Sequence, residues 1–250
     1  MPDTALETRG LTKAFGGFRA VRGLDLKVRR HAIHALIGPN GAGKTTVFNL
    51  LTKVHVPTEG QILYEGADIT RESSAAIARR GLVRSFQISA IFPNLSVRDN
   101  VRVALQRRLG TQYRFWRSGR TLRVLDEEAL RLLAEVGLAE AAEARAADLS
   151  YGRKRTLEIA TTLALDPPFL LLDEPTQGMA IEDVDRIKRL IRRIANGRTI
   201  LMVEHNMSVV ADLCDTITVL QRGEILAEGA YAAVSTDPAV RAAYLGGGHA

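Results

Sequence analysis

The stretch from Ile33 to Thr46, IHALIGPNGAGKTT, decides the fold. It begins with an apolar run of the kind that is buried in a parallel sheet. From Gly38 to Thr45 it fits the phosphate-binding pattern G-x-x-x-x-G-K-[ST]. Its glycines leave the backbone bare, so that several N–H groups can approach a chain of phosphates. Lys44 would reach the β- and γ-phosphates, and the Thr45 hydroxyl would bind Mg²⁺. The sequence therefore predicts a strand, a nucleotide-binding loop and a helix, in that order.

The composition describes one large globular domain or two small ones. The chain has 250 residues, of which 46% are hydrophobic and 25% charged, with a formal net charge of +6. This positive balance fits nucleic acid, an anionic membrane surface or nucleotide chemistry. Cys214 is the single cysteine, and the apolar helical pattern around it predicts a small buried residue. We expect no secretory signal and no membrane-spanning segment.

Two strands are predicted before the phosphate loop, at Leu6–Leu11 and Leu24–Val28, with a turn at Gly16-Gly17 between them. Phe15 precedes this turn. An aromatic side chain there serves either as a core residue or as a platform on which a base stacks. The residues alone leave both interpretations open. Beyond the loop, another strand is predicted to end at Gln87, which has no assigned role by itself.

The chain from 88 to about 165 is mostly helical in pattern. Between Arg107 and Arg123 it has six arginines and no acidic residue, interleaved with aromatic side chains. Nucleic acid, anionic lipid heads and plain solvent are all partners for such a stretch. Further along, Leu122–Val136 has the pattern of an amphipathic helix, and Ala139–Ala147 continues as an alanine-rich helical pattern.

Carboxylates follow a second buried run, Phe169–Leu172. Ligands of open α/β sheets bind at the carboxyl ends of the strands, which is where Asp173 and Glu174 would lie. Asp173 is suited to hold Mg²⁺ through water. Glu174 is suited to accept a hydrogen bond from a water and aim that water at the γ-phosphate. His205 follows another buried run and could donate a hydrogen bond to the same phosphate.

A second anion site is indicated before the helical pattern that runs to Leu165. Ser150 and Gly152 would supply a hydroxyl and bare backbone at the positive end of a helix. Arg153 in the first turn opposes that dipole unless an anion is present. An ordinary serine cap explains the same residues.

Together these motifs resemble the ATP-binding subunit of ABC transporters over essentially the whole chain. The elements that occur in that family's order are GPNGAGKTT at 38–46, Gln87, LSYGRKRTLEIA at 149–160, LLLDEP at 170–175 and His205. Their combination is far more specific than any one of them except the first.

The resemblance implies an α/β fold that consists of one ABC ATPase domain over residues 1–250. A P-loop NTPase core with a mainly parallel sheet, together with an antiparallel β subdomain, would comprise 1–87 and 166–250. An inserted α-helical subdomain that carries the signature motif would comprise 88–165.

The resemblance also implies roles for the site residues, with ATP and Mg²⁺ as cofactors. The catalytic residues would be Glu174, His205 and Gln87. The metal would be held by Thr45, Gln87 and Asp173. The nucleotide would contact Phe15 through its adenine, and the loop residues Gly38, Pro39, Asn40, Gly41, Ala42, Gly43, Lys44, Thr45 and Thr46 through its phosphates. The signature residues Ser150, Tyr151 and Gly152 would bind the γ-phosphate held by the opposite subunit.

Hydrolysis would therefore need two ATPase subunits, head to tail, with two ATP molecules between them. The second subunit is either a companion chain or a copy of this one. The other implied partners are two transmembrane permease subunits, contacted near Gln87, and indirectly a solute-binding protein. The resemblance places the chain in the cytoplasm, on the inner face of the membrane, with no nucleic acid as partner.

Within the family, the sequence looks like the branched-chain amino acid importers. The similarity is carried by GLVRSFQISAIFPNLSVRDNV at 81–101 and by DPAVRAAYLG at 237–246. Urea and amide importers, export systems and soluble non-transport ABC ATPases remain alternatives. Arg153 and Ala180 depart from the family's usual Gln and Asp or Asn, and both departures fit pairing with a companion ATPase.

Overall fold

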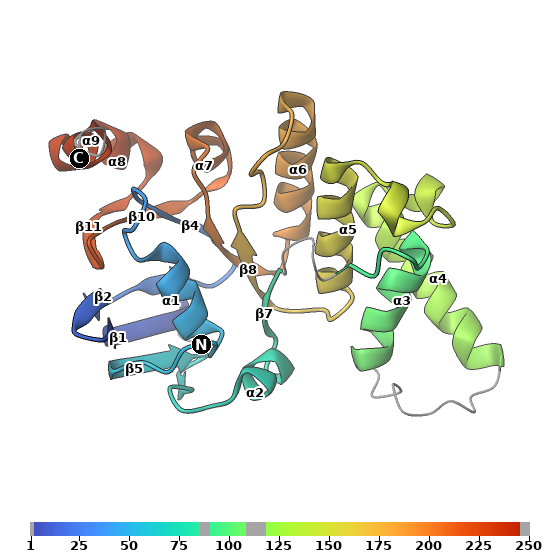
Figure 1. Cartoon of the computed structure of the whole chain (residues 1–250), viewed down its shortest axis with the longest axis horizontal. Helices are drawn as coiled ribbons and strands as arrows, with labels where there is room; N and C mark the ends of the chain where they lie inside the picture. Colours follow the sequence, from blue (N-terminus) through green and yellow to red (C-terminus); the bar gives the residue numbers. More distant parts are fainter. Residues whose placement is uncertain (1–2, 86–90, 109–118, 246–250) are drawn as a thin grey trace. The chain divides into compact units, whose positions relative to one another are not determined.

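The buried strand β4 (Ile33–Ile37) lies in the middle of a six-stranded sheet in this computed structural model (Figure 1). The sheet has the order β11-β10-β4-β9-β8-β7. Its other strands are β7 (Leu82–Arg84), β8 (Phe169–Asp173), β9 (Thr199–Val203), β10 (Thr216–Gln221) and β11 (Glu224–Gly229). Strands β10, β4, β9 and β8 run parallel, and β11 joins β10 as an antiparallel edge. The mainly parallel sheet expected from the sequence is confirmed.

The second sheet is antiparallel and is built around the long strand β1 (Thr4–Phe15). The other strands of this sheet are β2 (Phe18–Leu24), β3 (Lys27–Arg29), β5 (Glu59–Tyr64) and β6 (Ala67–Asp68). β1 pairs with β2 through a turn at the two glycines that follow Phe15. This sheet is the expected antiparallel β subdomain.

The hydrophobic core is shared by the two sheets and by helix α1 (Lys44–Leu51). Phe48 and Leu51 of α1 belong to one buried cluster with Leu6 of β1 and Leu171 of β8. These side chains are at most 1% exposed. The packing fixes the start of α1, and with it the phosphate loop, against the end of β4.

The structure describes residues 3–85, 91–108 and 119–245. The chain divides into two compact units, one of Met1–Val83, Pro168–Gln177 and Ile191–Ala250, and one of Arg84–Pro167 and Gly178–Leu190. Both sheets belong essentially to the first unit, with α1, α2 (Ser74–Arg79), α7 (Met207–Leu213), α8 (Tyr231–Thr236) and α9 (Pro238–Leu245). Helix α6 (Ile181–Ile194) begins in the second unit and ends in the first.

The second unit is helical. Its helices are α3 (Val97–Arg108), α4 (Gly119–Val136) and α5 (Tyr151–Leu163), with short 3₁₀ turns at Ala139–Ala141 and Ala146–Asp148. An Arg102–Asp126 ion pair of 3.0 Å joins α3 to α4. None of the helices in the described ranges is long and apolar enough to cross a membrane.

Three local predictions were wrong. The strand expected at Leu24–Val28 is interrupted, because the Asp25 carboxylate leaves the ladder and accepts a hydrogen bond of 2.6 Å from the Gly10 N–H. The helical pattern at Ala139–Ala147 forms only the two 3₁₀ turns. Cys214, which was expected to be buried, is only partly buried; it lies directly after α7, and burial raises the pKa of its thiol to about 12.

Candidate active site

The phosphate loop is a tight connection from the end of β4 to the start of α1. Gly38 has φ +147°, and a Cβ there would lie 2.2 Å from the Leu220 carbonyl oxygen. Gly43, the N-cap of α1, has φ +105°, and its Cβ would lie 2.6 Å from the Ala20 carbonyl oxygen. Because neither position has room for a side chain, only glycine permits this loop, which leaves the N–H groups at the start of α1 open to an anion.

Lys44 folds back over the loop that carries it. It is only 6% exposed, and its Nζ donates hydrogen bonds to the carbonyl oxygens of Gly38 (2.6 Å) and Pro39 (3.0 Å). Burial lowers the pKa of this ammonium, and the negative charge of Glu174 opposes that shift. A phosphate chain would offer the ammonium charged oxygens in place of two neutral carbonyls. The neighbouring Thr45 is exposed, so its hydroxyl is accessible to a ligand.

The acidic pair at the end of β8 lies at the same edge of the sheet as the loop. Asp173 is in register with Val203 of β9, and β9 pairs with β4. Glu174 has φ +46°, a conformation that costs about 1–3 kcal/mol in a residue other than glycine and is concentrated at functional sites. Its N–H donates to the Val203 carbonyl at 2.9 Å, which holds the residue in this conformation.

Glu174 and His205 contact each other directly. The Nε2 atom of His205 lies 2.5 Å from Oε1 of Glu174. Since an ionised carboxylate only accepts, the imidazole donates in this hydrogen bond. The side chain of Glu174 is 23% exposed and that of His205 is 43% exposed, so both reach the surface where a substrate would approach. Two of the three predicted catalytic residues therefore lie together, and the hydrogen bond orients the carboxylate.

Glu204 holds this arrangement in place and had no predicted role. It is 2% exposed. Its Oε1 accepts from the N–H and hydroxyl of Thr176, at 3.0 and 2.6 Å. Its Oε2 accepts from the N–H groups of His205 and Asn206, at 3.0 and 3.2 Å. The carboxylate thus ties the segment after Glu174 to the segment that carries His205. The position of Glu204 directly after a buried strand could have indicated a role, but the prediction for this segment was made for the neighbouring His205 alone.

We expect Glu204→Gln to lower the free energy of unfolding by about 2–3 kcal/mol, because an amide nitrogen would face buried N–H donors that now meet a carboxylate oxygen. Urea denaturation measures this. Glu224→Gln is the matched control, since the side chain of Glu224 is 63% exposed and its pair with Arg22 is 4.0 Å long. Equal stability of the two variants would contradict the bracing role of Glu204.

Of the two remaining predicted nucleotide-site residues in this part of the chain, the structure describes Phe15 but not Gln87. Phe15 is 42% exposed and is not a core residue. The Nζ of Lys13 lies 5.0 Å from its ring centroid, and His55 meets the ring edge-on at 5.2 Å. Stacking on adenine stays a prediction. Gln87 lies outside the described residues, as do the tail Gly246–Ala250 and most of the basic stretch.

The signature residues lie in the helical unit at the start of α5. Ser150 caps this helix and accepts from the N–H of Arg153 at 3.4 Å. Tyr151 is 49% exposed. Gly152 is buried, and a Cβ there would lie 2.5 Å from a carboxylate oxygen of Asp183. A side chain at 152 would therefore have to displace the Asp183 carboxylate within this unit, and the exposed Arg153 meets solvent.

A model of the family described as ABC transporter matches residues 21–177. The chain belongs to the ABC transporter family. A second model, described as branched-chain amino acid ATP-binding cassette transporter, matches residues 224–250. The resemblance inferred from the sequence motifs is confirmed, and as a cassette of this family the chain is an ATPase.

Two curated relatives cover nearly the whole cassette. The high-affinity branched-chain amino acid transport ATP-binding protein BraF of Pseudomonas aeruginosa is 40% identical, over 96% of this chain and 97% of its own. LivG of Escherichia coli (strain K12), which has the same description, is 38% identical over 98% of this chain and 99% of its own.

Solved structures confirm the fold class. The ADP conformation of MJ1267, an ATP-binding cassette of an ABC transporter, matches with TM-score 0.86 and 28% identity over 97% of this chain and 99% of that one. The dimeric, post-hydrolysis cassette MJ0796 with ADP and Pi matches with TM-score 0.76 and 25% identity over 90% and 98%. Membership of this family implies nucleotide binding, a dimer of cassettes and attachment to a transporter permease.

Proposed function

We propose that this chain is the ATP-hydrolysing subunit of an importer for branched-chain amino acids. Its relatives BraF and LivG are named for this transport and match 96% and 98% of the chain. The observation that carries the catalytic part of the proposal is the Glu174–His205 contact at the sheet edge where β4 leads into the phosphate loop.

In this proposal the predicted site residues divide the work of binding and hydrolysis. Lys44 and the bare loop backbone bind the β- and γ-phosphates. Glu174 accepts a proton from the attacking water, and His205 orients Glu174 and donates to the γ-phosphate oxygens. Phe15 offers an exposed ring to adenine, and Gln87 completes the site from the segment that would contact the permease.

The residues present fit Mg²⁺. The accessible Thr45 hydroxyl and the Asp173 carboxylate are hard oxygen ligands of the kind that this ion takes together with substrate phosphates and waters. The ion would neutralise charge on the phosphates.

We further propose that the chain is a single ABC ATPase domain that works head to tail with a second cassette. Ser150, Tyr151 and Gly152 of each subunit would bind the γ-phosphate held by the other. Arg153 and the exposed Ala180 favour a companion chain over a copy of this one. The permease would hold both subunits on the cytoplasmic face of the membrane, and a solute-binding protein would deliver the amino acid.

Uptake of labelled leucine tests the transport function. We expect cells whose only copy of this subunit carries Glu174→Gln to lose uptake nearly completely, because the hydrolysis that resets the transporter is blocked. The matched control is Glu59→Gln, which neutralises an exposed carboxylate of β5 and should leave uptake unchanged. Normal uptake by the Glu174→Gln cells, with the protein present at normal level, would contradict the assignment to leucine, and urea and amides would then be tested.

A further inference from the structure

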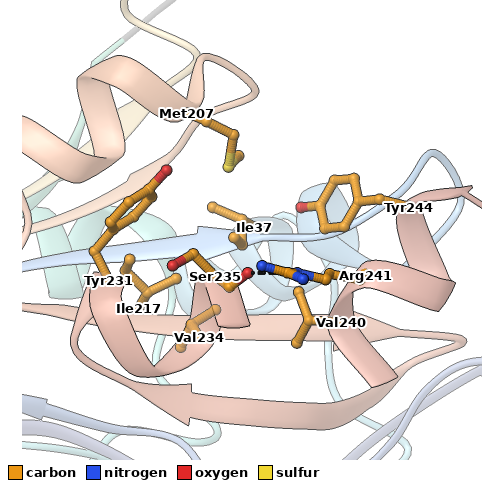
Figure 2. A pocket seen from close by; sticks show the side chains of 9 residues that line it. All are labelled: Ile37, Met207, Ile217, Tyr231, Val234, Ser235, Val240, Arg241 and Tyr244. Carbon is orange, nitrogen blue, oxygen red and sulfur yellow. Dashed lines mark hydrogen bonds between the residues drawn. The ribbon is translucent and has the colours of Figure 1, made fainter. Parts of the chain in front are cut away.

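A cavity of about 320 Å³ lies in the first unit beneath the C-terminal helices (Figure 2). Its walls come from β4, β10, α7, α8 and α9. Ile37, Ile217, Val234 and Val240 make most of its surface aliphatic, and Met207 closes one side. The volume is at the lower end of the range for small-molecule sites, about 300–1,000 Å³. None of the proposed catalytic residues lines the cavity.

One charged group borders this aliphatic space. The guanidinium of Arg241 reaches from α9 toward Ser235, whose carbonyl oxygen accepts from its Nε at 3.0 Å (Figure 2). Among the residues that the structure describes, no ion-pair partner of Arg241 is found, and no acidic side chain lines the cavity. The two terminal nitrogens of a guanidinium match the two oxygens of a carboxylate. The cavity therefore has an aliphatic lining that suits a branched hydrocarbon group, and at its edge a guanidinium that suits a carboxylate.

The cavity lies next to the phosphate loop along the chain. Ile37, which lines it, is the residue directly before Gly38, and Tyr244 of α9 lines it as well. Burial raises the pKa of the Tyr244 hydroxyl, and a hydrogen bond with the backbone of Gly38 opposes that shift. Gly38 in turn is packed against Leu220 and accepts from Lys44. A ligand in contact with Ile37 and Tyr244 would therefore act on the backbone next to the phosphate loop.

We propose that this cavity binds a small branched aliphatic carboxylate and that its occupancy changes the affinity of the phosphate loop for nucleotide. A branched 2-oxo acid and the corresponding amino acid have the same branched side chain and the same carboxylate. The amino acid adds an ammonium next to the carboxylate, where the positive charge of Arg241 would repel it and no acidic group of the lining would pair it. The oxo acid is therefore the favoured ligand. The site does not depend on the transport function, and only the coupling rests on the proposed nucleotide site.

Calorimetric titration of the purified full-length chain, without nucleotide, tests the site with 4-methyl-2-oxopentanoate as ligand. Leucine adds the ammonium, and 4-methyl-2-pentanone keeps the branched body but lacks the carboxylate. We expect the oxo acid to bind more tightly than either. Arg241→Gln should weaken the oxo acid about tenfold or more and leave the ketone unchanged, since only a charge-assisted pair is lost. Arg193→Gln, at an exposed arginine of α6 outside the lining, should change neither.

Ser235→Trp provides the second variant, because an indole from α8 would fill the cavity. It should abolish binding of both the oxo acid and the ketone, with the melting temperature showing that the chain is folded. No measurable binding of the oxo acid to the wild type, or equal binding by wild type, Arg241→Gln and Ser235→Trp, would overturn the site. Leucine binding as tight as that of the oxo acid would overturn the preference for a ligand without an ammonium.

ATP titration with and without the saturating oxo acid tests the coupling. We expect the ATP affinity measured with the oxo acid to differ from that measured without it. The oxo acid affinity should change by the same factor when ATP is present. Both changes should disappear in Tyr244→Phe. An unchanged ATP affinity would overturn the coupling. Failure of the chain to bind ATP at all would instead contradict the proposed nucleotide site and would leave the titration of the cavity untouched.

Discussion

Replacing Glu174 by glutamine is expected to lower ATP hydrolysis by about 10³-fold, within the range that a general base contributes. The amide cannot take the proton of the attacking water at neutral pH. Binding of ATP should stay within about twofold, because the phosphates are held by the loop and by Lys44 rather than by this carboxylate. A loss confined to turnover is the signature of a group that acts on the water.

The local structure makes this substitution a clean one. The backbone of Glu174 is held at φ +46° by the hydrogen bond from its N–H to Val203, which glutamine makes equally well. The amide oxygen can accept from His205 Nε2 as the carboxylate does, so His205 keeps its orientation. The two side chains have nearly the same size. What the variant loses is therefore the basicity at one atom.

Steady-state phosphate release and equilibrium ATP binding, measured on the same preparation, separate these effects. Glu59→Gln serves again as the control, since it removes one exposed carboxylate from β5. If Glu174→Gln hydrolysed ATP at the wild-type rate, Glu174 would not be the base. If it lost ATP binding as well, its role would lie in holding the loop.

The strands that end at the site could be predicted from the sequence because local patterns specify them. Phe169–Leu172 and Ile200–Val203 are uninterrupted apolar runs, and each ends in polar residues. Parallel strands bring such ends to one edge of a sheet, so the placing of Glu174 and His205 at that edge follows from their sequence positions. The phosphate loop is equally local, since its glycines, lysine and threonine all lie between Gly38 and Thr45.

The contacts between distant segments could not be predicted. Glu204 had a visible position but no visible partners, because Thr176 lies 28 residues away along the chain and its hydroxyl gives no pattern. The strand expected at Leu24–Val28 is interrupted where the Asp25 carboxylate accepts a hydrogen bond from the Gly10 N–H. The alternation of polar and apolar residues does not predict this bond. Arg241 and Tyr244 lie in the stretch that carried the family resemblance, but neither had a predicted role of its own, since the cavity that they line is formed only when residues of α8 and α9 meet residues of β4 and β10. Tertiary packing, rather than propensity, decides each of these cases.

The second large effect is expected from Lys44→Met, which should weaken ATP binding by about 100-fold. The ammonium would make charge-assisted hydrogen bonds to two phosphates, and thioether and methyl groups make none. Methionine keeps the length of the apolar stem, which packs at a position that is only 6% exposed. Equilibrium titration with ATP measures the loss, and unchanged affinity would contradict the role of Lys44.

Stability without nucleotide shows whether this loss is one of binding or of folding. Burial lowers the pKa of Lys44, which means that the folded loop disfavours the charged form of this side chain. Methionine removes that cost but also removes the hydrogen bonds to Gly38 and Pro39. These effects oppose each other, so we expect the free energy of unfolding to stay within about 1 kcal/mol of the wild type. A lysine whose removal leaves the fold intact but abolishes most of the affinity for ATP is retained for the phosphates that it binds.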